Sequence, residues 1–182
     1  MYQPRPIIHR ALSIDAGSRG GLGIAISEWS PEHMKLEWAE TLSPLDMQKK
    51  CDYPIDRYDI ITDVIKRYIN DFGVCEVVCE DIFCNAKLIL AYRSLVLTLN
   101  AVRIAVRDTI GGRLNLIRAN VAKNSVGVPA NNGDKTLVQK ALMREHPHLI
   151  IPSEIGLSYL DQHANDAVIV GYAYYLEKFH GS

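Results

Sequence analysis

The chain has 182 residues, 48% of them hydrophobic and 23% charged, and a formal net charge of −1. This length suits one domain with a substantial hydrophobic core, and the composition is that of an ordinary soluble globular protein. The near-neutral charge does not by itself indicate a nucleic-acid-binding protein. We therefore expect a single domain over residues 1–182.

Charge is nevertheless distributed unevenly along the sequence. Residues 103–144 contain eight Lys or Arg residues against two Asp residues, so this stretch carries a net charge of +6. A basic stretch of this kind suits a polyanionic substrate, although a solvated helix face is the alternative interpretation.

Cellular location is indicated only indirectly. Residues 1–10 contain no apolar signal core, and the longest apolar run, residues 167–176, is too short to span a bilayer. The four cysteines show no zinc-binding spacing, and we expect buried, reduced thiols. These features predict a cytoplasmic protein, in a bacterium or a phage-infected host, without membrane contact.

Hydrophobic periodicity and turn residues predict an alternation of strands and helices. The predicted strands cover residues 11–16, 22–28, 34–42, 74–80 and 114–119. The predicted helices cover residues 55–72, 85–110, 133 or 134 to 144, and 161–179. Short connections make the first three strands an antiparallel meander, and helical crossovers link the others. The fold class is therefore α/β, a mixed five-stranded sheet with helices on both faces.

The predicted helix over residues 85–110 is apolar on more than one face. Such a helix needs more than one packing partner. Either both faces are covered within the domain, or one face docks against a second subunit. Both interpretations remain open at this point.

Carboxylates stand where predicted elements end or begin. Asp15 and Glu80 end apolar strands, and Asp166 lies in the first turns of the last helix, three residues after His163. Brought together, these side chains would form a site for hard divalent cations such as Mg²⁺. Asp161 is better explained as the N-cap of that helix, and Asp81 points to the opposite face from Glu80.

Five segments in order resemble the motifs of RuvC-type Holliday junction resolvases. Residues 15–23, DAGSRGGLG, resemble their D-x-G-S-R-x-x-x-G motif, and EDIF at 80–83 resembles their second acidic motif. The segments VAKNSVG at 121–127 and GDKTLVQ at 133–139 resemble their two lysine-bearing segments. HANDA at 163–167 resembles their closing H-x-x-D-A motif. The compact form is similar to phage-type members.

The resemblance implies an RNase H-like fold, a homodimer and Mg²⁺-dependent paired nicking of four-way DNA junctions. It assigns two Mg²⁺ ions, replaceable by Mn²⁺, to Asp15, Glu80, His163 and Asp166. Lys123 and Lys135 would contact phosphates or offset transition-state charge, and Arg19 and Lys140 would contact DNA. Two departures stand out: many relatives have Asp at the position of His163, and residues 145–159 match no family motif.

Three other functions compete with this interpretation. An actin-like or sugar-kinase ATP-binding fold requires two such domains and a second D-x-G strand, and this chain is too short and has neither. An RNase H-like nuclease acting on RNA, unbranched DNA or other branched DNA is compatible with the same residues. A junction-binding protein without catalysis is disfavoured, because idle clustered carboxylates would repel phosphate.

Overall fold

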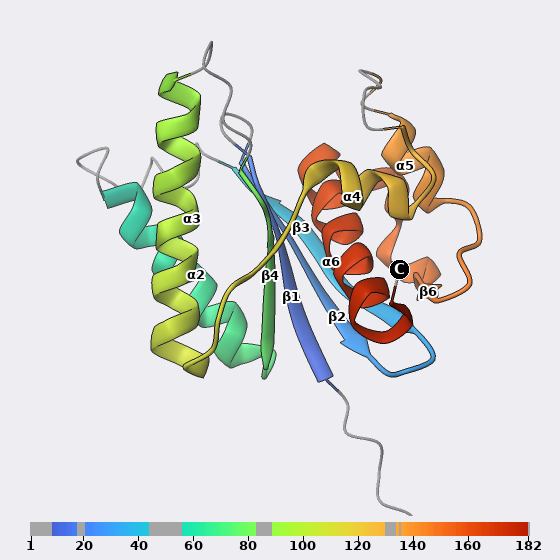
Figure 1. Ribbon diagram of the computed structural model, residues 1–182, viewed down its shortest axis with the longest axis horizontal. Coiled ribbons are helices and arrows are strands. Elements are labelled where there is room, and N and C mark those ends of the chain that lie inside the picture. Colours follow the sequence, from blue (N-terminus) through green and yellow to red (C-terminus); the bar gives the residue numbers. More distant parts are fainter. Residues whose placement is uncertain are drawn as a thin grey trace, which may run out of the picture.

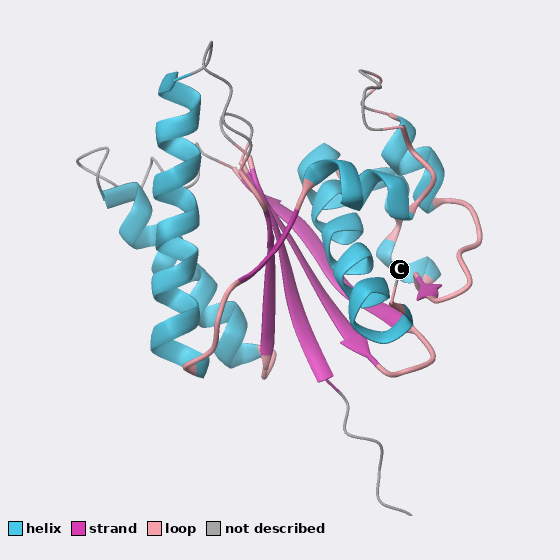
Figure 2. Cartoon of the chain, viewed as in Figure 1, coloured by secondary structure: helices cyan, strands magenta, loops and turns pink. Residues whose placement is uncertain are grey.

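A computed structural model describes residues 9–17, 21–43, 56–82, 89–129, 134 and 136–181. Figures 1 and 2 show a central twisted sheet with helices packed on either side. Its strands are β1 (His9–Ala16), β2 (Leu22–Trp29), β3 (Met34–Leu42), β4 (Glu76–Glu80), β5 (Asn115–Ile117) and β6 (Leu149–Ile150). Its helices are α2 (Asp56–Asp71), α3 (Ile89–Ile110), α4 (Ala119–Ser125), α5 (Leu137–Leu142) and α6 (Gln162–His180), with 3₁₀ turns η2 (Ser153–Ile155) and η3 (Leu157–Tyr159).

The sheet has the strand order β5-β4-β1-β2-β3-β6. β1, β2 and β3 form the expected antiparallel meander, whereas β4 pairs in parallel with β1, and β5 in parallel with β4. The predicted fold class is confirmed, but the predicted count of five strands is wrong by one. The additional strand, β6, has two residues and pairs in parallel with β3. It is too short to produce a detectable period in the sequence.

Two hydrophobic cores lie on opposite faces of the sheet. Strand residues alternate between them: Leu12 and Ile14 of β1 pack with α2 and α3, whereas Ala11 packs with α4, α5 and α6. This alternation is the period-two pattern of a sheet covered on both sides. In Figure 1, α2 and α3 cover one face and α6, with α4 and α5, covers the other.

Helix α6 is the main packing element of its face. Val168, Tyr172 and Tyr175 are almost completely buried, and the helix contacts the strands β1 to β5. Among the described residues, no helix has both the length and the hydrophobicity needed to cross a bilayer.

The segment after β5 differs from the prediction. The expected strand over residues 114–119 is shorter, and α4 begins already at Ala119. The third predicted helix, from residue 133 or 134 to 144, is also shorter than expected, since α5 covers only Leu137–Leu142. Of the two described cysteines, Cys79 is buried as expected but Cys75 is exposed, and both are free thiols.

The basic stretch of the sequence does not form one surface. Arg103 and Arg107 lie on α3, on the face of the sheet opposite α6, and Arg107 pairs with Asp108 at 2.9 Å. Lys123 and Lys140 lie on α4 and α5, on the same face as α6. Only part of the +6 charge is therefore on the α6 side of the molecule.

Asp161 caps α6, as expected. Its carboxylate accepts a hydrogen bond from the backbone N–H of Ala164 at 3.1 Å and another from the hydroxyl of Thr41. We expect Asp161→Ala to lower the free energy of unfolding by about 1 kcal/mol, the usual cost of losing an N-cap. Urea denaturation would measure the loss. Asp161→Asn keeps the acceptor oxygen and should lose much less, so equal losses would contradict the capping role.

Candidate active site at the acidic end of the sheet

Two carboxylates meet where adjacent parallel strands end. β1 and β4 pair in parallel with Ile14 opposite Cys79, so Asp15 and Glu80 follow as the next neighbours. Ile14 and Cys79 belong to the core beneath α2 and α3. Because side chains alternate along a strand, Asp15 and Glu80 project to the other face, under α6.

Helix α6 brings the remaining two side chains to these strand ends. Its N-terminal end lies at the top of Figure 1, where β1 and β4 also end. Nδ1 of His163 lies 2.6 Å from Oδ2 of Asp15. Asp166 lies one turn further along the same helix face. All four side chains line a cavity of about 250 Å³, together with Ala119, Ala122, Lys123, Gln162, Ile169 and Val170.

The cavity strongly disfavours accumulated negative charge. Burial, followed by the hydrogen bond to Asp15 and the charges of Asp15 and Asp166, raises the pKa of Glu80 to about 9. Burial and the charge of Asp15 raise the pKa of Asp166 to about 6. At neutral pH a protonated Glu80 therefore donates a hydrogen bond to Asp15. Lys123 opposes both shifts, but it does not compensate for them.

The same negative charge favours the charged form of His163. Its hydrogen bond to Asp15 outweighs its burial and raises the pKa of the imidazole above the usual range. Without a metal ion, Asp15 thus favours the imidazolium form, which would balance its negative charge. A metal-binding imidazole must be neutral, so ion binding and proton release from His163 would be coupled.

The donor set fits a hard divalent cation. It offers three carboxylates and one imidazole, and oxygen donors are the ligands that Mg²⁺ and Mn²⁺ prefer. In the part of the chain that the structure describes, however, no three His, Cys, Asp or Glu side chains are arranged so that they could hold a metal ion. Asp15 instead contacts His163 and Glu80 directly, so protons occupy the contacts that a cation would take over.

The other predicted site residues fall into three groups. Lys123 lines the cavity, whereas Lys140 is exposed on α5 and does not contribute to its lining. Arg19 and Lys135 lie outside the described residues. Asp81 also lies outside the lining, and its carboxylate accepts a hydrogen bond from the backbone N–H of Ile82 at 2.9 Å.

Sequence reasoning missed Gln162. Its side-chain amide donates a hydrogen bond to Oδ2 of Asp166 at 3.4 Å, which helps to keep the pKa of that carboxyl from rising further. The spacing of four residues from Asp166 within a helix was the available signal. The spacing indicates a role for Gln162 only after Asp166 has been assigned to the site.

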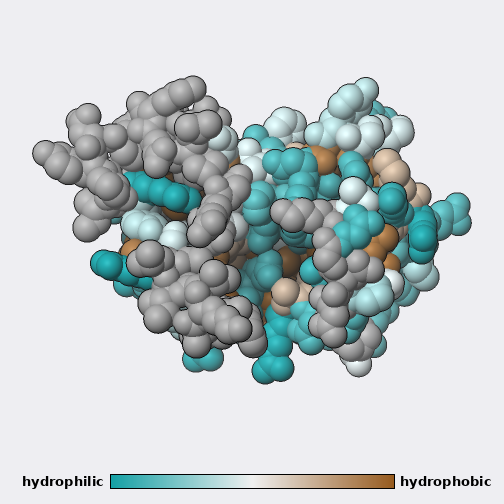
Figure 3. Space-filling view, turned by 90° about the horizontal axis from the view of Figure 1, so that it is seen from above, coloured by the Kyte–Doolittle hydropathy of each residue, from teal (hydrophilic) through white to brown (hydrophobic). Residues whose placement is uncertain are grey.

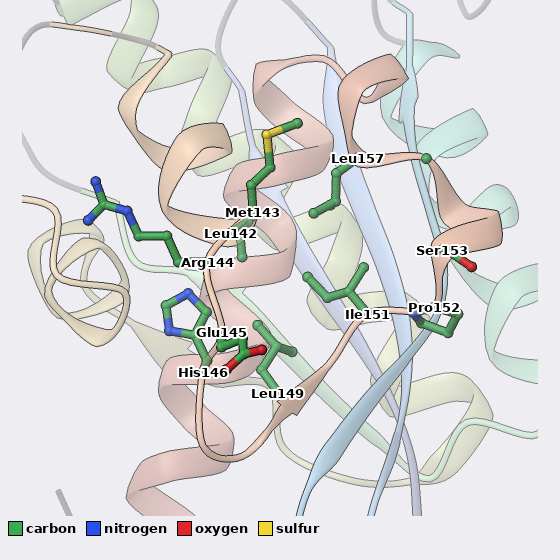
Figure 4. A pocket seen from close by; sticks show the side chains of 11 residues that line it. Leu142, Met143, Arg144, Glu145, His146, Leu149, Ile151, Pro152, Ser153 and Leu157 are labelled. Atoms are coloured by element: carbon green, nitrogen blue, oxygen red, sulfur yellow. The ribbon is translucent and has the colours of Figure 1, made fainter.

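A second cavity, of about 360 Å³, lies on the far side of α5 from this site, between that helix, β6 and the 3₁₀ turns (Figure 4). Leu142, Leu149, Ile151 and Leu157 contribute apolar side chains, and the ionisable groups are those of Arg144, Glu145 and His146. This cavity has the larger volume, but it does not gather convergent carboxylates. The acidic cavity is therefore the better candidate for chemistry.

The strand order and the strand directions are those of an RNase H-like fold, and carboxylates stand at the ends of two of its parallel strands. The described surface at this end of the molecule is largely hydrophilic in Figure 3, as suits a site open to a polar substrate. A scan of protein-family models and a search of curated proteins both found no match.

Several solved structures have a similar fold. The chain matches Thermus thermophilus RuvC with a TM-score of 0.64 and 20% identity, covering 94% of this chain and 96% of RuvC. It matches T. thermophilus RuvC in complex with a Holliday junction substrate with a TM-score of 0.62 and 18% identity, covering 95% and 96%. The yeast mitochondrial Holliday junction resolvase Ydc2 matches with a TM-score of 0.58 and 12% identity, covering 95% and 80%. The chain thus has the fold of the RuvC-type resolvases over nearly its whole length.

Proposed function

We propose that the protein is a divalent-metal-dependent endonuclease that resolves four-way DNA junctions by paired, symmetric nicks. The convergence of Asp15, Glu80, His163 and Asp166 on one cavity is the observation that carries this proposal. The fold of the RuvC-type resolvases supports it, and one of those structures contains a Holliday junction substrate.

The side chains of the cavity divide into metal ligands and a lysine that offsets charge. Asp15, Glu80 and Asp166 would hold Mg²⁺ ions, with Mn²⁺ as a substitute, and His163 would complete the second site. Such ions supply a water nucleophile of lowered pKa and charge stabilisation at the leaving oxygen. Before an ion binds, Asp15 holds the His163 imidazole in place through its contact with Nδ1, and Lys123 offsets negative charge at the edge of the cavity.

A cleavage assay on a synthetic four-way junction with Mg²⁺ and mapped cut sites tests the proposal. We expect symmetric cuts in two opposing strands, ligatable ends, and no cleavage in EDTA. Competition with linear duplex, RNA–DNA hybrid and other branched DNA separates the proposal from the rival nuclease functions. Preferential cleavage of the hybrid or the linear duplex would replace the junction assignment.

Paired nicks require two active sites, so the proposal includes a homodimer. Helix α3 presents Val96 and Leu97 to solvent, 41% and 37% exposed, which leaves apolar surface for a second subunit. This favours the second-subunit interpretation of its extra apolar face. Light scattering should give the mass of a dimer at working concentrations, and a monomer would contradict this part of the proposal.

Lys123 offers a graded test of the same site. We expect Lys123→Ala to reduce the cleavage rate by on the order of 100-fold, because removing one group that stabilises developing charge has about that effect. Lys123→Arg keeps the charge and should retain much of the rate. Lys140→Ala is the matched control, since Lys140 is exposed on the same face outside the cavity. Single-turnover kinetics at saturating DNA would measure all three, and equal effects of the two Ala variants would contradict a special role for Lys123.

A further inference from the structure

The strand residue opposite Asp15 has no side chain. Asp15 pairs with Gly23 across β1 and β2, and directly paired residues project to the same face of a sheet. A Cβ atom at Gly23 would lie 1.9 Å from the carbonyl oxygen of His163 and 2.4 Å from its carbonyl carbon. The main chain of His163 therefore occupies the space that a side chain would take beside Asp15.

A second glycine packs against the ring of the same histidine. A Cβ atom at Gly17 would lie 2.6 Å from Cε1 and 2.9 Å from Nδ1 of the His163 imidazole. Nδ1 is the atom that contacts Asp15. The same Cβ atom would also lie 2.3 Å from the carbonyl oxygen of Gly21, so this site is crowded on two sides.

We propose that Gly17 and Gly23 together form a seat that positions His163 against Asp15; they are positioning residues and do not take part in the chemistry. Gly23 sets how closely the first turn of α6 approaches β2, and Gly17 sets where the imidazole lies. Because Asp166 follows one turn later, the same seat brings it towards Glu80. The catalytic part of this inference rests on the proposed nuclease function.

The contact at Gly23 differs in kind from ordinary helix–sheet packing. It is made with backbone atoms, which cannot rotate away, so an added methyl group must displace the start of α6. Gly171 provides a comparison on the same helix, two turns further along. A Cβ atom there would lie 2.7 Å from Oγ and 3.0 Å from Cβ of Ser13 on β1, away from the acidic cavity.

The first experiment compares Gly23→Ala with Gly171→Ala in the full-length protein. We expect both to lower the melting temperature, since both crowd the interface of α6 with the sheet. Only Gly23→Ala should also reduce Mg²⁺-dependent junction cleavage, by on the order of 100-fold, the effect of a displacement of about 1 Å in an active site. Only Gly23→Ala should weaken Mn²⁺ binding measured by calorimetry. Equal losses of cleavage and Mn²⁺ binding in the two variants, or unchanged cleavage and Mn²⁺ binding in Gly23→Ala, would overturn the proposal.

The second experiment needs neither DNA nor metal. Gly17→Ala is combined with His163→Ala, and melting temperatures are measured for the wild type, both single variants and the double variant. If the ring packs on Gly17, the loss caused by Gly17→Ala should be smaller when the imidazole is absent. Strictly additive losses would refute the seat at Gly17.

The two experiments separate failure of the seat from failure of the nuclease function. Should the wild type not cleave junctions while the melting temperatures remain coupled, the nuclease proposal fails and the seat stands. If Gly23→Ala does not fold, the melting temperatures of Gly17→Ala, His163→Ala and the double variant test the proposal by themselves.

Discussion

Asp15→Asn should abolish cleavage of a four-way junction while junction binding persists. Asp15 is 6% exposed, contacts His163 at 2.6 Å and hydrogen-bonds to Glu80, so it links both halves of the site. The amide keeps the size of the side chain but removes a charged oxygen ligand. We expect cleavage to fall by at least about 100-fold, because even groups that only support metal ligands cost 10–100-fold when removed. Glu80→Gln should behave in the same way.

DNA binding should survive these substitutions because neutralising an acid reduces its repulsion of phosphate. Gel-shift titration in Ca²⁺ or EDTA would measure binding, and single-turnover kinetics in Mg²⁺ would measure cleavage. Asp81→Asn is the matched control: it alters the neighbouring acid, which does not line the cavity. Cleavage should remain close to that of the wild type. Wild-type rates in Asp15→Asn, or an equal loss in Asp81→Asn, would contradict the assignment of the site.

The stability of the metal-free protein should fall as the pH rises from about 5 to 9. The folded protein holds protons on Glu80, with a pKa of about 9, and on Asp166, with a pKa of about 6, that the unfolded chain releases near pH 4. Between those values the folded state binds more protons, so raising the pH favours unfolding. His163 acts in the same direction, because its raised pKa stabilises the fold below neutral pH and that stabilisation is lost as the imidazole deprotonates.

Glu80→Gln should remove much of this pH dependence and raise the melting temperature of the metal-free protein near pH 8. Scans from pH 5 to 9 in EDTA would measure both effects, with Glu28→Gln on β2 as the control outside the cavity. Added Mn²⁺ should stabilise the wild type more at pH 8 than at pH 5.5, because a cation replaces protons on the carboxylates. A melting temperature that rises with pH in EDTA would contradict the protonated state of Glu80.

The architecture could be predicted from the sequence where periods are long and unambiguous. The apolar runs of β1 and β2, the alternating pattern of β3 and the amphipathic pattern of α2 correspond to the elements in the structure. Very short elements could not be predicted, because the two residues of β6 and the short helix α4 depend on neighbours that are distant in the sequence. Propensity alone does not determine structure in such segments.

The acidic residues of the candidate site could be named from the sequence, but their protonation states could not. Strand ends and a helix start indicated Asp15, Glu80 and Asp166, and the sequence also favoured Asp161 as a cap, which the structure confirms. The sequence could not indicate that Glu80 is protonated at neutral pH. That property follows from burial and from the closeness of Asp15, and both are tertiary.

By itself, the sequence determined that an α/β domain would carry acidic residues at strand ends, because hydrophobic periodicity and chain order are local properties. Only the tertiary structure decided which side chains share the cavity, that the +6 stretch divides between the two faces of the sheet, and that glycines flank His163. The shared cavity and the glycine contacts depend on how closely α6 approaches β1 and β2. That distance is set by packing between segments that are far apart in the chain, as in the contact of Asp15 with His163, which are 148 residues apart.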